Sequence, residues 1–241
     1  RGAGRDSVAH LEAVKDTLRG DVVLRGTIPA GDSAVVPVTF RDQNEAYVNG
    51  LAEALRDRGI TILGSALAPA TTVDTLLVMH SPPLAQILAA FMRESQNQLG
   101  EMLFKSIALA RADTGSAVVA RRLFTEQLLG WGAESDGFIV WDGSGLSRRD
   151  MVSPETVVRV LDTMRRSRNF QAYYDALSIA GVDGTLRTRM RGTTGEANVR
   201  GKTGTLGNVR TLSGFVTTAG GATLIFSVLC NNYLVSTDHI S

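Results

Sequence analysis

The chain has 241 residues, of which 44% are hydrophobic and 20% charged, a length and composition that fit one large folded domain and exclude a disordered chain. Its formal charge of +1 gives no overall basic excess of the kind that indicates a nucleic-acid-binding protein. The one cysteine, Cys230, excludes an intramolecular disulfide, and the three histidines are far apart in the sequence. We therefore expect no metal site and no nucleic-acid partner.

The N-terminal segment predicts strands followed by a helix. Residues 21–25 and 34–40 are rich in β-branched side chains and flank a turn-rich stretch, which predicts two strands. From Asp42, apolar residues recur every fourth position, so we expect a helix with Asp42 as its N-cap and Gly59 at its end. Residues 60–63 predict another short strand.

Apolar residues recur at helical spacing in the middle of the chain. The spacing predicts helices over residues 84–94, 99–109 and 116–129. A further helix should begin at Ser153-Pro154, because serine is a favoured N-cap and proline a favoured first helical residue.

The C-terminal part predicts an antiparallel meander. Residues 199–206, 209–218 and 222–230 are β-rich runs separated by turn sequences, and residues 138–141 predict a strand before a Gly/Ser loop at 142–147. The predicted fold class is α+β: a helical cluster packed on an antiparallel sheet, preceded by a small β-rich piece.

Lys202 lies in a sequence that invites two interpretations. Gly201-Lys202-Thr203 is not a phosphate-binding P-loop, because the glycine that this motif requires is replaced by Glu196 and a strand follows instead of a helix. On a strand, Lys-Thr-Gly-Thr at 202–205 presents an ammonium, two hydroxyls and a free backbone N–H, and Gly204 leaves room for a ligand backbone. An exposed lysine on an edge strand is the alternative.

Ser95-Gln96-Asn97 lies where one apolar helical face ends and the next begins. Such a junction can direct polar side chains inward. The alternative is helix capping, a common role of serine and asparagine.

Together, Ser-x-Asn and Lys-Thr-Gly resemble two of the three signatures of the penicillin-recognising serine enzymes. Co-ordered segments extend the resemblance to most of the chain, from about residue 25 to 233, and they are residues 81–84, 94–103, 142–147, 180–186 and 199–206. In this order they resemble the D-alanyl-D-alanine carboxypeptidase/endopeptidase family of the penicillin-binding protein 4 type.

The resemblance implies a role for each candidate residue. Ser95 would relay protons, and Asn97 would hydrogen-bond the substrate carbonyl and steady the catalytic lysine. Lys202, Thr203 and Thr205 would bind the C-terminal carboxylate of the substrate, with the Thr205 N–H in the oxyanion hole and Gly204 beside it. The loop at 142–147 would support the site.

The sequence departs from the family at the nucleophile. No serine is followed by lysine at the third residue after it, so Ser-x-x-Lys does not occur in these 241 residues. We expect a C-terminal portion of the enzyme, in which residues 1–40 are the end of an inserted β-rich domain and residues 41–241 are a transpeptidase-like domain without its N-terminal part. Alone, the chain should be inactive.

The parent protein is expected to be an extracytoplasmic serine-type peptidase that acts on peptidoglycan stem peptides, binds β-lactams and needs no cofactor. A serine β-lactamase or esterase of the same fold is one alternative, and a non-catalytic peptidoglycan-binding protein is another. The incomplete domain should leave apolar strands open, so we expect it to self-associate or to be held by its own N-terminal part.

Overall fold

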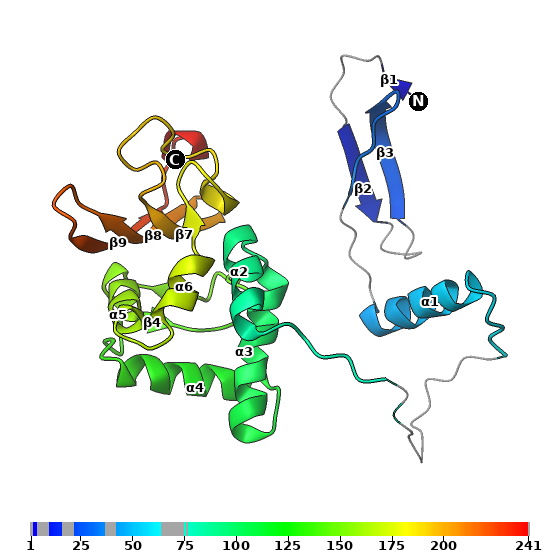
Figure 1. Cartoon of the computed structure of the whole chain (residues 1–241), viewed down its shortest axis with the longest axis horizontal. Helices are drawn as coiled ribbons and strands as arrows, with labels where there is room; N and C mark the ends of the chain where they lie inside the picture. Colours follow the sequence, from blue (N-terminus) through cyan, green and yellow to red (C-terminus); the bar gives the residue numbers. More distant parts are fainter. Residues whose placement is uncertain are drawn as a thin grey trace. The chain divides into compact units, whose positions relative to one another are not determined.

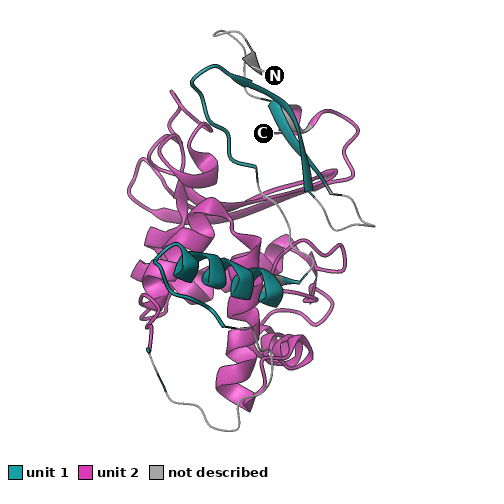
Figure 2. Cartoon of the chain, turned by 90° about the vertical axis from the view of Figure 1, so that its right-hand side faces the viewer, with its two compact units in different colours: residues 1–77 teal, residues 78–241 magenta. Residues whose placement is uncertain are grey.

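The structure, a computed structural model, describes residues 2–3, 10–15, 22–36, 42–63, 75 and 77–240. The chain forms two compact units, Arg1–Leu77 and Val78–Ser241, which Figure 2 shows in different colours. The sequence prediction divides the chain earlier, between residues 40 and 41. The boundary between residues 40 and 41 is where the inserted β-rich domain is expected to end and the transpeptidase-like domain to continue. It stays a prediction.

The first unit contains a small sheet and one helix. Strands β1 (Gly2–Ala3), β2 (His10–Lys15) and β3 (Val22–Pro29) lie in the order β1-β3-β2, with β2 and β3 antiparallel. Helix α1 (Gln43–Arg56) begins as predicted, because the Asp42 carboxylate accepts hydrogen bonds from the N–H groups of Asn44 and Glu45, both at 3.0 Å.

The sequence predicts three strands in the first unit besides its helix. The strand expected at 21–25 is confirmed by β3, which continues to Pro29. The strand expected at 60–63 is wrong, because these residues are irregular and have no paired strand in the described part of the chain. Of the strand expected at 34–40, residues 34–36 are not in a strand, and residues 37–40 lie outside the described residues.

The second unit contains the four helices that the sequence predicts. They are α2 (Leu84–Glu94), α3 (Asn97–Ala112), α4 (Ala117–Gly130) and α5 (Pro154–Arg165). Ser116 and Ser153 cap α4 and α5 by accepting hydrogen bonds from backbone N–H groups. A short helix, α6 (Phe170–Ala176), was not predicted, because seven residues are too few to show a clear helical period.

The sheet of the second unit confirms the predicted antiparallel meander. Strands β6 (Ser178–Ile179), β7 (Arg200–Leu206), β8 (Val209–Thr217) and β9 (Thr223–Asn231) lie in that order, each antiparallel to the next. Two short strands, β4 (Phe138–Ile139) and β5 (Met151–Val152), pair separately, and 3-10 turns occur at η1 (Gly184–Leu186) and η2 (Thr237–Ile240). The turn between β7 and β8 is made by Gly207 and Asn208, whose φ is 59°.

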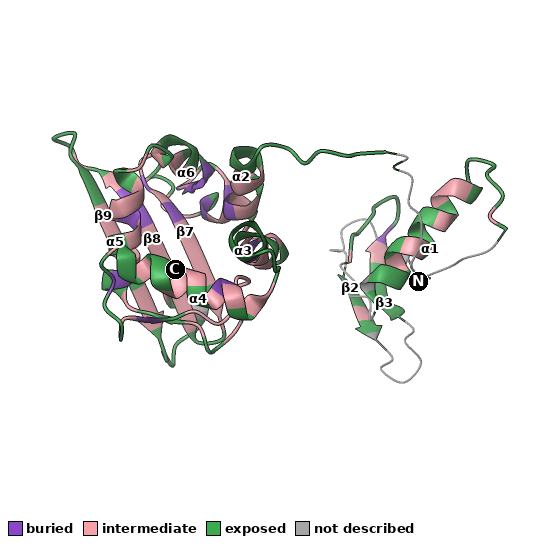
Figure 3. Cartoon of the chain, turned by 90° about the horizontal axis from the view of Figure 1, so that it is seen from below, coloured by how far each residue is buried: buried purple, intermediate pink, exposed green. Residues whose placement is uncertain are grey.

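The core of the second unit lies between the sheet and helices α2, α5 and α6 (Figures 1 and 3). Its buried residues include Met92 from α2, Leu161 from α5 and Phe215 from β8. A second cluster joins α3 to α4 through Phe104, Ala108 and Ala120. This arrangement of helices on an antiparallel sheet confirms the α+β fold class.

Candidate active site

All six candidate site residues line one pocket of the second unit. The pocket has a volume of about 470 Å³ and is built by the α2–α3 junction, the loop at 143–146, Thr185 and strand β7. Its lining residues are Phe91, Ser95, Asn97, Gly143, Ser144, Gly145, Leu146, Thr185, Lys202, Thr203, Gly204 and Thr205. Residues more than one hundred positions apart in the sequence therefore meet at one site.

The junction between α2 and α3 explains how Ser95 and Asn97 reach this pocket. Helix α2 stops because Ser95 takes a left-handed conformation, with φ 54° and ψ 51°, which is uncommon for a residue with a side chain. Helix α3 begins two residues later at Asn97, and its N-cap is Gln96. Neither Ser95 nor Asn97 is therefore the N-cap of α3, and both side chains are free for other contacts.

Lys202 is directed into the site. Its Nζ donates hydrogen bonds to Ser95 Oγ at 2.6 Å and to the Thr203 carbonyl at 2.7 Å. Burial lowers the pKa of Lys202 from 10.5 to about 8, because the charged ammonium loses water that the neutral amine does not need. No carboxylate in the described part of the chain forms an ion pair with this lysine. An exposed edge lysine does not fit these observations.

Strand β7 presents an open edge to the pocket. Strand β6 pairs with Arg200 and Gly201 only, so residues 202–206 have no partner strand on that side among the described strands. On this edge, the Val199 carbonyl accepts a hydrogen bond from the Ala180 N–H at 2.9 Å. The backbone N–H and C=O groups of every second residue in a strand point to the same neighbouring strand. The N–H and C=O groups of Thr203 and Thr205 therefore face the open edge.

A chain of hydroxyl groups supports the Thr203 side chain. Thr203 Oγ1 donates to Thr185 Oγ1 at 2.8 Å, and Thr185 Oγ1 lies 3.3 Å from Ser178 Oγ. Ser178 is fully buried and also accepts from the Thr185 N–H at 3.2 Å. The sequence pattern alone does not indicate a role for Thr185, although this residue lies within the segment 180–186 that carries part of the family resemblance.

Strand β8 packs against Thr205 and Gly204 of β7. Arg210 Nη1 donates to Thr205 Oγ1 at 3.1 Å, and β8 carries this arginine directly opposite Thr205. No sequence pattern indicates Arg210 as a site residue, because the hairpin register decides which residue faces Thr205. A Cβ at Gly204 would lie 2.5 Å from Thr211 Oγ1, so a larger residue at this position would displace the Thr211 side chain on β8.

The loop at 142–147 forms another wall of the pocket, and the carboxylates of Asp142 and Glu101 help to hold its backbone. Asp142 Oδ1 accepts from the N–H groups of Ser144 and Gly145, both at 2.9 Å, which closes a tight turn. Glu101 Oε2 on α3 accepts from the Gly143 N–H at 2.8 Å. The Asn97 amide, oriented to satisfy its neighbours, donates to the Ser144 carbonyl at 3.2 Å. The loop therefore sets the orientation of Asn97.

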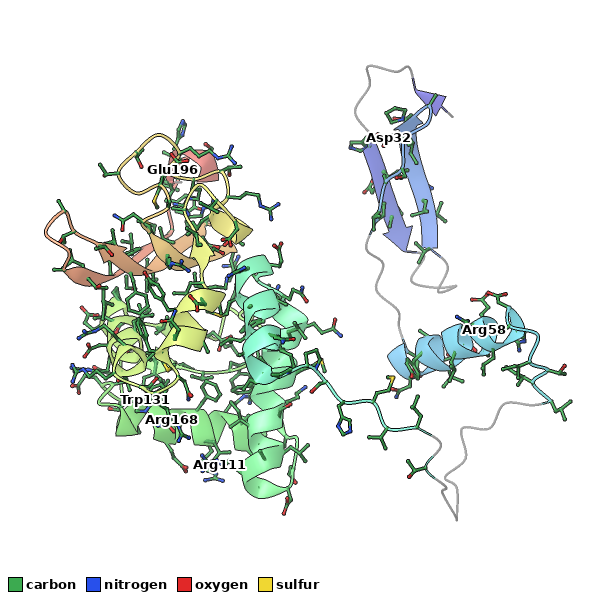
Figure 4. All side chains as sticks on the ribbon, in the orientation of Figure 1. Asp32, Arg58, Arg111, Trp131, Arg168 and Glu196 are labelled. Atoms are coloured by element: carbon green, nitrogen blue, oxygen red, sulfur yellow. The ribbon has the colours of Figure 1, made fainter. Side chains whose placement is uncertain are left out.

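Besides this pocket, the described residues contain a larger pocket, but no cluster of metal ligands and no membrane-spanning helix. A larger pocket of about 600 Å³ lies between α3 and α4, but it contains none of the candidate residues; its rim includes Arg111 and Trp131, labelled in Figure 4. Within the described ranges, no group of three acidic, histidine or cysteine side chains could hold a metal ion. No described helix combines the length and apolar character that crossing a membrane requires.

The α+β fold with Ser-x-Asn beside Lys-Thr-Gly is the fold of penicillin-recognising serine enzymes. The chain belongs to the D-Ala-D-Ala carboxypeptidase 3 (S13) family, whose model matches residues 5–240. The family resemblance inferred from the sequence is therefore confirmed.

Individual relatives agree with the family assignment. A D-alanyl-D-alanine carboxypeptidase from Actinomadura sp. is 35% identical over 223 residues, which cover 88% of this chain and 41% of the relative. The carboxypeptidase DacB of Haemophilus influenzae is 32% identical over 203 residues, which cover 81% of this chain and 42% of the relative.

A solved structure supports the same fold. Penicillin-binding protein 4 of H. influenzae, complexed with a β-lactam, superposes with a TM-score of 0.76 at 27% identity, covering 95% of this chain and 53% of that one. The chain therefore spans only 41–53% of the length of the relatives and the solved structure that it matches.

Proposed function

We propose that this chain carries the substrate-binding and proton-relay groups of a serine-type D-Ala-D-Ala carboxypeptidase/endopeptidase that acts on peptidoglycan stem peptides. The observation that carries the proposal is the 2.6 Å hydrogen bond from Lys202 to Ser95, in the pocket that also contains Asn97, Thr203 and Thr205. The likeness to D-Ala-D-Ala carboxypeptidases supports it.

The open edge of β7 can receive the end of an extended peptide. Backbone groups of Thr203 and Thr205 would pair with the peptide, as a strand pairs with a sheet edge. The Thr203 and Thr205 hydroxyls and the Lys202 ammonium would bind its C-terminal carboxylate, and the Thr205 N–H would donate to the developing oxyanion.

On the other side of the bound peptide, Asn97 and Ser95 would act on the scissile bond. The Asn97 amide, held by the Ser144 carbonyl, would donate to the substrate carbonyl. Ser95 would pass a proton to the leaving amine, and Lys202 would resupply it across the 2.6 Å hydrogen bond.

The acylated serine is proposed to come from outside these 241 residues, because the sequence contains no Ser-x-x-Lys. An acyl-enzyme cannot form without a nucleophile positioned at the peptide carbonyl. We therefore expect that a fluorescent penicillin does not label the isolated chain covalently. A stable label on this chain would refute this part of the proposal. Action on peptidoglycan further implies an extracytoplasmic location.

Recognition of the peptide is testable without turnover. Titration of the ¹⁵N-labelled chain with N-acetyl-D-Ala-D-Ala should shift the amide signals of Thr203 and Thr205. The same peptide with a C-terminal amide should bind at least about tenfold more weakly, because a charge-assisted hydrogen bond contributes about 1.5–3 kcal/mol. Lys202→Ala should lose this preference for the carboxylate. Arg122→Ala, which removes an exposed cation from α4, should keep it. Equal binding of acid and amide by the unaltered chain would contradict the proposal.

A non-catalytic peptidoglycan-binding protein is the second candidate, and the lack of Ser-x-x-Lys in these residues favours it. The sequence upstream of Arg1 in the gene separates the two candidates. A Ser-x-x-Lys there supports the peptidase, and a divergent domain supports the binding protein.

A further inference from the structure

The Ser95–Lys202 pair combines a nucleophile and a base, both supplied by this chain. We propose that Ser95, activated by Lys202, is a nucleophile in its own right, and that it reacts with small neutral electrophiles such as aryl esters and fluorophosphonates. This inference rests on the proposed function for the location of the site. It does not depend on the peptide substrate or on a serine from outside the chain.

The hydrogen bonds of Lys202 fit the role of a general base. Nζ lies 2.6 Å from Ser95 Oγ and 2.7 Å from the Thr203 carbonyl. A neutral amine retains two N–H groups, so it can still donate to Thr203 while its lone pair accepts the Ser95 hydroxyl proton. The Thr203 carbonyl thus keeps Nζ beside the serine in both protonation states. A nucleophile in hydrogen-bond contact with an oriented base is the arrangement that activates serine.

The charged groups near Ser95 and Lys202 do not hold the Lys202 amine in its protonated form. Burial brings the pKa of Lys202 to about 8, so the base is available in mildly alkaline solution. The charged groups on the neighbouring α2 and η1 segments are engaged with one another, Arg93 with Asp183 at 3.6 Å and Arg187 with Glu94 at 3.4 Å. None of these four forms an ion pair with Lys202, so none holds it in the charged state.

The reaction requires only Ser95, Lys202, the ester and water. Ser95 Oγ attacks the acyl carbon as its proton moves to Lys202 Nζ, which gives a tetrahedral intermediate and an ammonium. The intermediate expels the alkoxide or phenolate, which takes the proton from Nζ. Water then attacks the acyl-serine, with Nζ as the base, and releases the acid and free Ser95. With a fluorophosphonate, fluoride leaves and the stable phosphonyl-serine remains.

Charge should decide which molecules react at Ser95. A peptide or penicillin carries a carboxylate, and Thr203 and Thr205 would anchor it so that Ser95 faces the leaving amine instead of the carbonyl carbon. A neutral ester lacks this anchor and can turn its carbonyl toward Ser95. The pocket of about 470 Å³ is large enough to hold such a molecule.

The test uses the full chain and a fluorescent alkyl fluorophosphonate, followed by peptide mapping by mass spectrometry. We expect the adduct on Ser95, with a rate that rises about tenfold per pH unit below pH 8 and levels off above it. N-acetyl-D-Ala-D-Ala should slow the labelling by occupying the pocket.

Two variants and a control separate base catalysis from simple exposure of the serine. Lys202→Arg keeps a cation beside Ser95 that cannot act as a base, so labelling should fall at least about 100-fold. Ser95→Ala should abolish the adduct. Ser106→Ala, on α3, removes a serine whose hydroxyl donates to the Met102 carbonyl, and it should label at the unaltered rate. Circular dichroism checks that each variant is folded.

Two outcomes would overturn the inference: no adduct on Ser95 in the unaltered chain at pH 9, or equal labelling rates of the unaltered chain and Lys202→Arg. Because the first outcome needs no variant, the test holds even if Lys202→Arg does not fold. If Ser95 is not labelled but the peptide titration gives the expected shifts, only the inference about Ser95 is rejected. If Ser95 is labelled but the peptide does not bind, only the proposed function is rejected.

Discussion

At the scale of single residues, Lys202 is held where its own charge is unfavourable. The side chain gives up solvent and gains two hydrogen bonds, to Ser95 and to the Thr203 carbonyl, but no ion pair with a described carboxylate. The depressed pKa of about 8 measures this imbalance. The proposed roles of Lys202, binding a carboxylate and exchanging a proton, would require such a setting, and its cost falls on the stability of the fold.

Lys202→Met should therefore stabilise the second unit at pH 7. A pKa that falls from 10.5 to about 8 corresponds to about 3 kcal/mol against the charged form, so we expect the free energy of unfolding to rise by about 1–3 kcal/mol. Between pH 8 and 10.5 the unfolded chain binds more protons than the folded one, so the unaltered protein gains stability and the difference shrinks. Urea unfolding followed by tryptophan fluorescence measures this, since Trp131 and Trp141 both lie in the second unit. A loss of stability at pH 7 would show that this account is incorrect.

At the scale of elements, helix α3 and the loop at 142–147 form one side of the pocket as a unit. Glu101 holds the Gly143 N–H at 2.8 Å while it pairs with Lys105 at 2.9 Å. The hydrogen bond from Lys105 and that from Gly143 both lower the pKa of Glu101 below 4.5. Asn97, on the same helix, is oriented by the loop backbone at Ser144. A defect in this contact should therefore reach the site through Asn97.

Glu101→Ala should release the loop without touching the pocket directly. The side-chain amide signals of Asn97 should lose their dispersion, and binding of N-acetyl-D-Ala-D-Ala should weaken by about tenfold, the effect of one lost hydrogen bond to a charged group. Glu101→Gln keeps an acceptor for Gly143 and should restore most of both. In the unaltered chain the Gly143 amide signal should shift as Glu101 is protonated below pH 4.5, and the stabilisation from Glu101 is lost as the pH falls through that range. An unchanged Asn97 signal in Glu101→Ala would contradict this role.

The close approach of α3 to the loop depends on glycine at two facing positions. A Cβ on Gly143 would overlap Phe104 Cβ and the Gly100 carbonyl. Gly143→Ala should therefore cost about 1–3 kcal/mol of unfolding free energy, because both contacts are with groups that cannot move aside. Gly130→Ala, at the end of α4, meets no atom within 4 Å and should cost nothing. Urea unfolding of the two variants compares them directly.

At the scale of the whole molecule, the sheet of the second unit ends in a long edge strand. β9 has nine residues and pairs only with β8 in the described sheet. Leu224 and Val228, on the sheet face that carries Leu212 and Val216, are 52% and 53% exposed. An edge with unpaired backbone groups and apolar side chains is a site for pairing with another chain.

We therefore expect the isolated chain to self-associate in light scattering at micromolar concentration. Leu224→Lys with Val228→Lys should shift the chain toward the monomer, because charged residues on an edge strand oppose strand pairing. Val118→Lys, which changes an exposed valine on α4, should leave the association unchanged. A monodisperse, unaltered monomer would contradict the expectation.

The sequence by itself determined the helices, the meander and the two short motifs, because these depend on local spacing. Asp42 and Ser153 act as the predicted N-caps, and Gly207-Asn208 makes the predicted turn, since capping and turn chemistry involve neighbours within a few residues. The short elements α6 and β6 escaped prediction, and the strand expected at 60–63 did not form, because elements of this length depend on tertiary contacts instead of on their own pattern.

The choice between the interpretations of the two motifs depends on contacts between residues far apart in the sequence. Ser95 and Lys202 are 107 positions apart, so no local pattern could distinguish a capping serine and an exposed lysine from a hydrogen-bonded pair. The hairpin register places Arg210 opposite Thr205, and the fold brings Thr185 to Thr203. The depressed pKa of Lys202 is likewise a property of burial, which residue types alone do not fix. The structure divides the chain into two compact units, and the second, Val78–Ser241, contains the candidate site.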